Sequence, residues 1–445
     1  MKRTKITMKP QIMKVTSVVV GASMMLMAGG TSVCAETADG EKTVLTGYTM
    51  YVDSLAMTEA IVFNECVKEF QEMHPEVDFQ MEQVSSDMYV TKLQAAAAAD
   101  ELPMLFPALS SYQQTYAASN QILVLNEYLD ADQEWKEGFL EGAFDDQTIG
   151  EDIYAIPYEN LLSNVIFYNK DIFAECGITE FPKTLDEFKT VCTAIAEKGY
   201  IPIAIGNKTK DPLSSVVAPG IVFKYVSQDW YNNVKNYNGA KFTDPEYIEA
   251  IKALGELIEM GAFNPDMNSL DGAVAIGQYY YTGKAAMVIN GTWGVSTMIN
   301  ECPEEILNVT SVAAMPGNNP EYEAQVPGGT GWGWCVGANG DEKQTELAIE
   351  FLKLLTSKST HQKIIDSGSI SAVNVSPSAD TELHPLFKEF LKLRESITMV
   401  PTPEIQLNSE YVNASYVGYQ DYSIGAITAE ELAEKLQQAH ESGQK

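Results

Sequence analysis

Arginine is nearly absent from this 445-residue chain, which holds only Arg3 and Arg394. Sites for phosphates and dicarboxylates usually need the guanidinium fork, and nucleic-acid binding needs many lysines and arginines to displace counterions. The formal net charge of −32 is also unfavourable for nucleic acid. The composition therefore argues against a nucleic-acid partner and favours a neutral ligand.

Catalytic and metal-binding motifs are missing as well. There is no His-Glu-x-x-His motif, no Cys/His cluster and no Gly-x-Ser-x-Gly elbow. The glycine-rich run 328–331 leads into a predicted strand rather than a helix, so it is not a phosphate-binding loop. Adjacent carboxylates such as Glu151 and Asp152 could serve a glycosidase, but nothing marks such a pair as buried. We predict no catalytic residue, no cofactor and no metal site.

Long apolar runs are absent except near the amino terminus. Residues 1–14 hold five basic residues and no acid, and an apolar run over 15–28 follows. That run is shorter than the ~20 residues that a membrane-spanning helix needs. The pattern predicts an export signal over residues 1–35, with cleavage before Glu36. The alternative is a lipid anchor on Cys34, although Val33 stands where glycine or alanine is usual.

Removal of the signal would change the net charge to −32 − 5 = −37, which favours a soluble monomer outside the cell. Five cysteines would remain, without a Cys-x-x-Cys pair. They form either one disulfide plus a free thiol or, as we favour, five buried small hydrophobic residues. The five are Cys66, Cys176, Cys192, Cys302 and Cys335.

The length predicts two domains. In the first part of the chain, β-type and helix-type segments alternate, which is typical of a parallel sheet covered by helices. The expected strands are 44–51, 75–84 and 105–109, and the expected helices start at Thr58 and cover 89–99.

A central stretch organises the rest of the chain. Residues 153–158 and 165–168 are short apolar runs typical of strands, and a polar crossing separates them. A helix then begins with Thr184 as N-cap and Glu187 in a capping box, and Gly199 stands where a C′ glycine should.

This stretch resembles the central signature of family 1 extracellular solute-binding proteins, the maltose-binding-protein-like receptors of bacterial ABC importers. The resemblance rests on residues 167–173, Cys176-Gly177-Ile178 and the run 182–188. Residues 283–293 resemble the second signature of the family. The order of glycine pair, strand, charged turn and helix over 328–355 is also that of the family.

The resemblance implies an α/β fold of the type II periplasmic-binding-protein kind, in which two lobes are joined by a multi-stranded hinge. It implies an exported receptor that closes on a sugar and delivers it to a membrane permease. Two alternatives stay open: a receptor for a polyol, a polyamine or a phosphorylated sugar, and a secreted glycan-active enzyme. The expected boundaries are 36–156 and 327–365 for lobe 1, 157–315 and 376–445 for lobe 2, and 316–326 and 366–375 for the hinge crossings.

Aromatic residues are plentiful, with five Trp and 22 Tyr. Their rings can cover the apolar face of a pyranose. Trp293 lies between Gly291 and Gly294, on an expected tight turn at the end of a strand, where ligands of open α/β sheets sit. The resemblance implies that this tryptophan stacks on the sugar. We expect one of the two tryptophans after the glycine pair to face the cleft and the other to lie in the core. The further aromatic candidates are Trp332, Trp334, Trp230 and Tyr231.

Polar candidates for the sugar hydroxyls lie in loops after the first three strands and in the crossings. For each serine and aspartate the alternative is a helix cap. We give the carboxylates Asp53 and Glu159 more weight than the serines. The full set is Asp53, Ser54, Ser86, Asp87, Ser110, Ser111, Glu159, Asn160 and Gly329.

Overall fold

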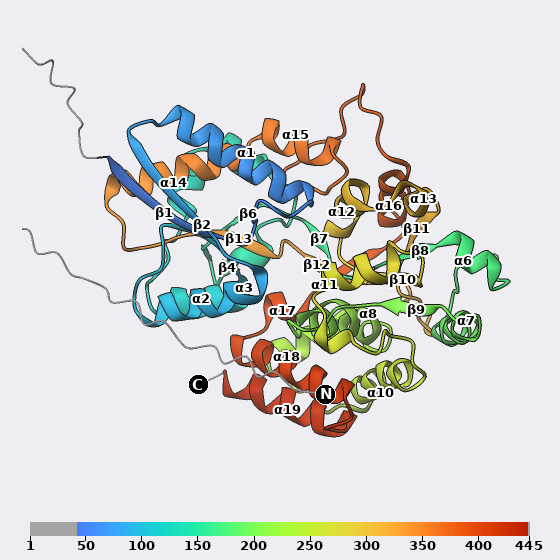
Figure 1. Ribbon diagram of the computed structural model, residues 1–445. Helices are drawn as coiled ribbons and strands as arrows, with labels where there is room; N and C mark the ends of the chain where they lie inside the picture. Colours follow the sequence, from blue (N-terminus) through green and yellow to red (C-terminus); the bar gives the residue numbers. More distant parts are fainter. Residues whose placement is uncertain (1–41, 444–445) are drawn as a thin grey trace, which may run out of the picture. The chain divides into compact units, whose positions relative to one another are not determined.

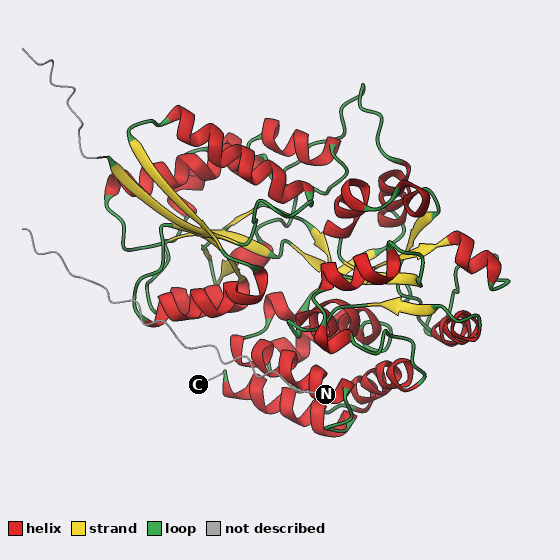
Figure 2. Ribbon diagram, viewed as in Figure 1, coloured by secondary structure: helices red, strands yellow, loops and turns green. Residues whose placement is uncertain are grey.

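The computed structural model describes residues 42–443, which belong to one compact unit of strands and helices (Figure 1, Figure 2). The predicted signal segment, its cleavage before Glu36 and the anchor on Cys34 lie outside the described residues. None of the helices between residues 42 and 443 is both long and apolar enough to cross a membrane.

A five-stranded sheet forms the first lobe. Its strands follow the order β2-β1-β3-β13-β6; β1 runs parallel to β2 and β3, whereas β13 is antiparallel to β3 and β6. The predicted parallel start of this sheet is therefore confirmed. The bounds are β1 (Thr43–Thr49), β2 (Val77–Gln83), β3 (Leu105–Leu109), β6 (Ile156–Pro157) and β13 (Trp332–Val336).

The predicted strand over 153–158 is wrong in its continuity. The chain forms β5 (Asp152–Ile153), which pairs with β4 (Thr148–Ile149), and only then β6, which pairs with β13. Between them Tyr154 donates its backbone N–H to the carbonyl of Gln147 at 3.0 Å. The segment changes partner within six residues, so its short apolar run does not form one strand.

A four-stranded sheet forms the second lobe, in the order β11-β8-β10-β9. β10 is parallel to β9 and antiparallel to β8. Its strands are β8 (Val165–Asn169), β9 (Ile201–Ala204), β10 (Ala285–Asn290) and β11 (Thr310–Ala313). A third sheet joins segments that are far apart in the sequence, in the order β14-β12-β7. It consists of β7 (Leu161–Leu162), β12 (Gln325–Gly329) and β14 (Thr398–Pro401).

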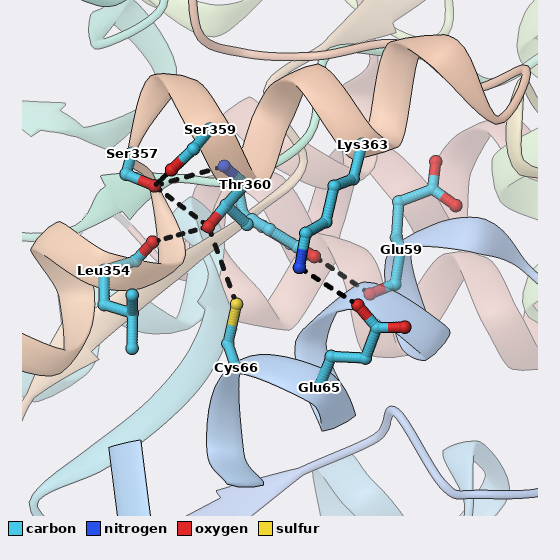
Figure 3. A network of polar contacts seen from close by, with 9 residues as sticks. Glu59, Glu65, Cys66, Leu354, Ser357, Ser359, Thr360 and Lys363 are labelled. Atoms are coloured by element: carbon cyan, nitrogen blue, oxygen red, sulfur yellow. Dashed lines mark hydrogen bonds and ion pairs between the residues drawn. The ribbon is translucent and has the colours of Figure 1, made fainter. Parts of the chain in front are cut away.

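Helices cover both faces of the first sheet, with α1, α14 and α15 on one face and α2 and α3 on the other (Figure 1). Helix α1 contacts α14 and α15 directly. In this layer Cys66 lies 3.7 Å from the Thr360 hydroxyl, and Lys363 pairs with Glu65 at 3.2 Å (Figure 3). The bounds are α1 (Thr58–Met73), α2 (Ser86–Ala98), α3 (Ser110–Ala118), α14 (Glu342–Leu355) and α15 (Lys358–Asp366); short helices α4 (Asn126–Asp130), α5 (Gln133–Glu137) and η1 (Asp145–Gln147) complete this lobe.

Helices from the last part of the chain pack on earlier elements of the second lobe. Helix α16 packs on β11 and α12, and α19 packs on α10 and α18. The earlier helices are α6 (Lys170–Glu175), α7 (Leu185–Glu197), η2 (Pro212–Val217, a π-helix), α8 (Ala218–Val222), α9 (Gln228–Lys235), α10 (Pro245–Glu259), η3 (Met267–Ser269), α11 (Gly272–Ala275) and η4 (Ile276–Tyr280). The later helices are α12 (Trp293–Glu301), α13 (Glu304–Leu307), α16 (Pro385–Arg394), α17 (Pro403–Gln406), α18 (Ser409–Ser423) and α19 (Ala429–Ser442).

Local capping signals form as predicted. The Thr184 side chain accepts from the Glu187 backbone in a capping box, and Gly199 takes a φ of +88° after α7. Thr428 and Glu431 form the same box at the start of α19. All five cysteines of the described residues are free; four are buried, as we expected of all five, whereas Cys176 is half-buried.

One hydrophobic cluster contains residues of both sheets. Phe106 and Leu109 of β3 belong to the same buried cluster as Ile203 of β9 and Met287 of β10. A second cluster lies in the first lobe alone and surrounds Trp334. The two lobes therefore share buried apolar surface in this conformation, and the boundary between them is where a closing ligand site would lie.

Candidate functional site

The carboxyl edges of the two sheets face each other across this boundary. On one side, helix α1, which follows β1, meets helix α12, which follows β10. The Thr58 backbone N–H donates to the Ser296 hydroxyl at 3.2 Å, and the Asn300 amide donates to the Ala56 carbonyl at 2.7 Å. On the other side, α3, which follows β3, contacts α17 and α18. We take the residues between these two contacts as the candidate site.

Trp293 is the first residue of α12, whereas the sequence predicted a tight turn at this position. Its side chain is half-buried. The indole folds back over Gly291, because a Cβ atom on that glycine would lie only 1.9 Å from Trp293 Cζ3. Gly291 thus makes room for the ring, and the strand end and the helix start fix where the ring lies.

The two tryptophans of β13 have different environments, as we expected for the residues that follow the glycine pair. Trp334 is fully buried, stacks on Phe63 with ring centroids 4.9 Å apart, and meets Phe351 edge-on. A fully buried indole has no face for a ligand, so we correct its place among the site candidates: it is a core residue. Trp332 is half-buried and packs edge-to-face on Tyr89 at 5.7 Å. It pairs with Leu109, so it lies at the carboxyl edge of β3.

Trp230 and Tyr231 lie in α9 and are accounted for by packing. Trp230 stacks on Tyr247 at 5.5 Å and donates its indole N–H to Asp244 at 2.9 Å. Tyr231 is 1% exposed and meets Phe223 edge-on. These contacts belong to the second lobe, and we remove both residues from the candidate ligand contacts.

The candidate residues after β1 are exposed, and those after β2 lie in a helix rather than in a loop. Asp53 and Ser54 are exposed, and the Asp53 backbone N–H donates to Gln83 at 3.1 Å. Ser86 is the first residue of α2 and is exposed, and Asp87 follows it in the helix.

Ser110 and Ser111 begin helix α3, and both are buried. The N-cap of this helix is Leu109, without a side-chain cap, so the serines do not serve as caps. The Ser111 hydroxyl has no hydrogen-bond partner among the described residues although only 1% of the residue is exposed. A buried hydroxyl without a partner at this edge is available to a ligand.

Glu159 and Asn160 were predicted as crossing residues that face the ligand. Glu159 is only 4% exposed and accepts from the Tyr51 hydroxyl at 2.6 Å, and its backbone forms a bridge with Ser371. Its carboxylate thus belongs to a buried network between α1 and the crossings, which corrects its placement in the ligand set. Asn160 is half-buried.

Gly329 has a structural role in β12. A Cβ atom there would lie 2.3 Å from Asp146 Oδ2, and this oxygen accepts from the Thr330 backbone N–H at 2.9 Å. The other Asp146 oxygen accepts from Gln406 at 2.9 Å. The glycine allows a buried aspartate to join η1, β12 and α17.

Four residues that sequence reasoning missed form an acidic cluster in the second lobe. Glu404 of α17 accepts from the hydroxyls of Tyr416 and Ser215. Burial, together with the nearby charge of Asp211, raises the pKa of Glu404 to about 7. Burial also raises the pKa of Asp211. No lysine or arginine among the described residues forms an ion pair with either carboxylate.

This acidic cluster, defined as Asp211, Ser215, Glu404 and Tyr416, faces helix α3 of the first lobe. The Glu404 charge adds to burial in raising the pKa of the Tyr112 phenol. The Tyr112 hydroxyl also lies 3.5 Å from Asn413 of α18. Asp211 could have been found, because it follows β9 just as the chosen loops follow the first three strands. Glu404 lies in a four-residue helix with no local signal.

Within residues 42–443, no group of three or more His, Cys, Asp or Glu side chains could hold a metal ion. A groove of about 640 Å³ is lined only by first-lobe residues, among them Tyr48, Glu82 and Asp100. It lies away from the boundary, so we do not take it as the solute site.

Comparison with known proteins agrees with this architecture. The family described as "Bacterial extracellular solute-binding protein" matches residues 58–362. An uncharacterised ABC transporter extracellular-binding protein of Pyrococcus horikoshii is 27% identical over 243 residues, 53% of each chain. The diacetylchitobiose binding protein DasA of Streptomyces coelicolor is 26% identical over 275 residues, 60% of this chain and 59% of that protein. The chain spans little more than half the length of these curated relatives.

Among solved structures, a chitin oligosaccharide binding protein superposes with a TM-score of 0.83 at 22% identity. The match covers 91% of this chain and 99% of that chain. The expected two-lobed α/β fold of the type II periplasmic-binding-protein kind is thereby confirmed.

Proposed function

The chain belongs to the bacterial extracellular solute-binding proteins, and from this we propose that it captures a neutral sugar or short oligosaccharide between its lobes and delivers it to the membrane permease of an ABC importer. The sugar ligands of the relatives named above support this class of solute.

One observation carries the proposal. Trp293 and Trp332 are half-buried indoles at the carboxyl edges of the two sheets, one from each lobe. Aromatic faces of this kind match the apolar C–H face of a pyranose. The free Ser111 hydroxyl and the carboxylates of the acidic cluster would bind sugar hydroxyls.

A second candidate ligand is an amine, such as a polyamine or an amino sugar. The observation in its favour is the pair Asp211 and Glu404, two carboxylates with raised pKa values and no cationic partner. A phosphorylated sugar is less well supported, because Arg394, the one arginine of the described residues, lies at the end of α16 and is desolvated. Among residues 42–443 we find no arrangement of side chains that supports the glycan-active enzyme.

The remaining expectations extend the proposal. The lobe boundaries 36–156 with 327–365 and 157–315 with 376–445 fit the packing of α15 on α1 and of α16 on β11. We propose that the protein is exported, acts as a monomer, and loses residues 1–35 or keeps a lipid on Cys34. Intact mass of protein recovered from cells distinguishes cleavage before Glu36 from a diacylglycerol on Cys34.

The test is calorimetric titration of the purified protein with diacetylchitobiose, xylobiose, maltotriose, galactose, glucosamine and spermidine. The proposal expects micromolar or tighter binding of at least one neutral sugar. Binding of spermidine alone would refute the neutral sugar and favour an amine as the ligand. Incubation with the matching polysaccharides and analysis of released sugar tests the enzyme: release of sugar would refute a purely binding role.

A further inference from the structure

Two glutamates lie buried near each other where the first lobe meets the crossings. Glu59, in the first turn of α1, is 1% exposed, and Glu159, before β7, is 4% exposed. The Tyr51 hydroxyl donates to Glu159 at 2.6 Å, and the Ser369 hydroxyl donates to Glu59. The charge of Glu59 is close enough to raise the pKa of Glu159, which burial and this charge together bring to about 8.

Within residues 42–443, neither of these two carboxylates forms an ion pair. Lys363 of the packed helix α15 directs its amine to Glu65 rather than to the Glu59 carboxylate (Figure 3). The other titratable groups that face the pair are neutral at pH 7. Burial lowers the pKa of His361 to about 3, and it raises the pKa of the Cys66 thiol to about 11. The Tyr51 and Tyr158 phenols are buried, and burial raises their pKa values as well.

Two uncompensated buried carboxylates cannot both be charged at low cost, so the pair retains a proton at neutral pH. Burial also raises the pKa of Glu59. The pair therefore loses its last proton only in the alkaline range, at a pH that depends on how completely water is excluded from the site.

The exclusion of water from the pair depends on the contact between the two lobes. Glu59 follows Thr58, whose N–H donates to Ser296 of α12 in the second lobe. The Ser296 hydroxyl also lies beside the Glu59 carboxylate. On the other side, Glu159 bridges Ser371 in the predicted crossing 366–375. A movement that separates α1 from α12 would remove Ser296 and admit water to Glu59.

We propose that the Glu59–Glu159 pair is a proton switch for lobe closure, in which the closed form holds the shared proton and loss of that proton favours the open form. The inference rests on the proposed function, because closure is taken to enclose the solute. The sign follows from hydration: water stabilises the charged pair, so the open form binds the proton more weakly than the closed form. A ligand of the closed form must then bind with proton uptake, and its affinity must fall as pH rises from the pKa of the open form to the higher pKa of the closed form.

The first test needs no ligand. Small-angle scattering of the ligand-free protein is recorded from pH 6 to pH 9.5 for the parent and for Glu159→Gln, with Glu59→Gln as a second variant. We expect the radius of gyration of the parent to rise with pH, and those of both variants to stay at the low-pH value. Glu65→Gln is the matched control, because it removes a carboxylate from the same helix but leaves the pair intact; its radius should follow the parent. A radius that does not change with pH, or that changes equally in all four proteins, would refute the switch.

The second test uses a sugar found in the titrations above. Each unit of difference between the closed and open pKa changes affinity roughly tenfold over the pH interval between the two pKa values. Titration in two buffers of different ionisation enthalpy should show proton uptake at pH 7 in the parent and none in Glu159→Gln. Tight binding with no pH dependence and no proton uptake would overturn the switch and leave the proposed function intact. A pH-dependent radius without binding of any probe would support the switch and refute the proposed function.

If either variant fails to fold, carbon-13 titration of the glutamate carboxyls in the parent replaces it. Two linked steps, of which the later lies near or above pH 8, support the pair. Titration of all glutamates below pH 6 refutes it.

Discussion

Trp293 and Trp334 offer a matched pair for separating recognition from packing. Trp293 follows the end of β10, and Trp334 lies within β13. Only Trp293 keeps part of its side chain exposed. Replacement of Trp293 by alanine removes a rigid aromatic face from the proposed contact with the sugar. Truncation of such anchors costs ~2–4 kcal/mol, which is roughly 30- to 1000-fold in affinity. We expect the variant to melt close to the parent, because its indole rests on a helix start rather than inside the core.

Replacement of Trp334 by alanine should do the opposite. Its ring is 0% exposed and lies 4.9 Å from Phe63 and 6.4 Å from Phe351, centroid to centroid. Removal of a buried tryptophan costs ~3–5 kcal/mol of the free energy of unfolding. The folded fraction should still bind sugar, since the residue has no face toward the ligand.

The assay is thermal melting and sugar titration of the parent and both variants under one set of conditions. The expected pattern is lost affinity with a retained Tm for Trp293→Ala, and a lowered Tm with retained affinity for Trp334→Ala. A Trp293→Ala protein that melts much earlier yet binds normally when folded would refute the platform. Lost affinity in a stable Trp334→Ala protein would refute its assignment to the core.

Three further outcomes are expected. Gly291→Ala should weaken sugar binding nearly as much as Trp293→Ala, because its methyl group would lie 1.9 Å from the indole and displace it; titration of a variant with a retained Tm checks this. Gly329→Ala should lower the free energy of unfolding by ~1–3 kcal/mol, because its methyl group would clash with Asp146 Oδ2 at 2.3 Å; denaturant unfolding measures it, and an unchanged midpoint would contradict the clash. Burial lowers the pKa of His361 from 6.5 to about 3, so the neutral form is favoured in the fold and stability is lost as pH falls below 6.5; at pH 5 this amounts to about 2 kcal/mol relative to His361→Gln, and equal pH profiles for parent and variant would refute it.

Local patterns predicted the elements well wherever the chain's own neighbours decide the conformation. Thr184 and Glu187 cap a helix by contacts three residues apart, and such a motif is visible in the sequence. The sequence also led us to expect different environments for Trp332 and Trp334, which follow the glycine pair. It could not decide which of them is buried, because that depends on Phe63 and Phe351 in distant helices.

The candidate site was less predictable, because its polar groups are selected by contacts across the chain. Glu159 was chosen as a crossing residue that contacts the ligand, yet it accepts a hydrogen bond from Tyr51, which is 108 residues away. Glu404 was missed, since its partners Tyr416 and Ser215 give no pattern in the sequence. Asp53 and Ser54 lie in a loop after a strand, as the selection required, and yet they are exposed. The end of a strand identifies the edge of the sheet, but tertiary packing decides which side chains at that edge are free.

The position of β13 in the first sheet has a consequence for the order of folding. This strand lies between β3 and β6, although residues 332–336 follow the whole four-stranded sheet in the sequence. During synthesis, β3 therefore has an unpaired edge until residue 336 has emerged, by which point every strand of the second lobe's sheet has been made. A sheet that needs such a late strand closes a long loop and forms slowly. The sheet of the first lobe is thus completed after the sheet of the second lobe, and in a shorter nascent chain the edge of β3 remains open to chaperones.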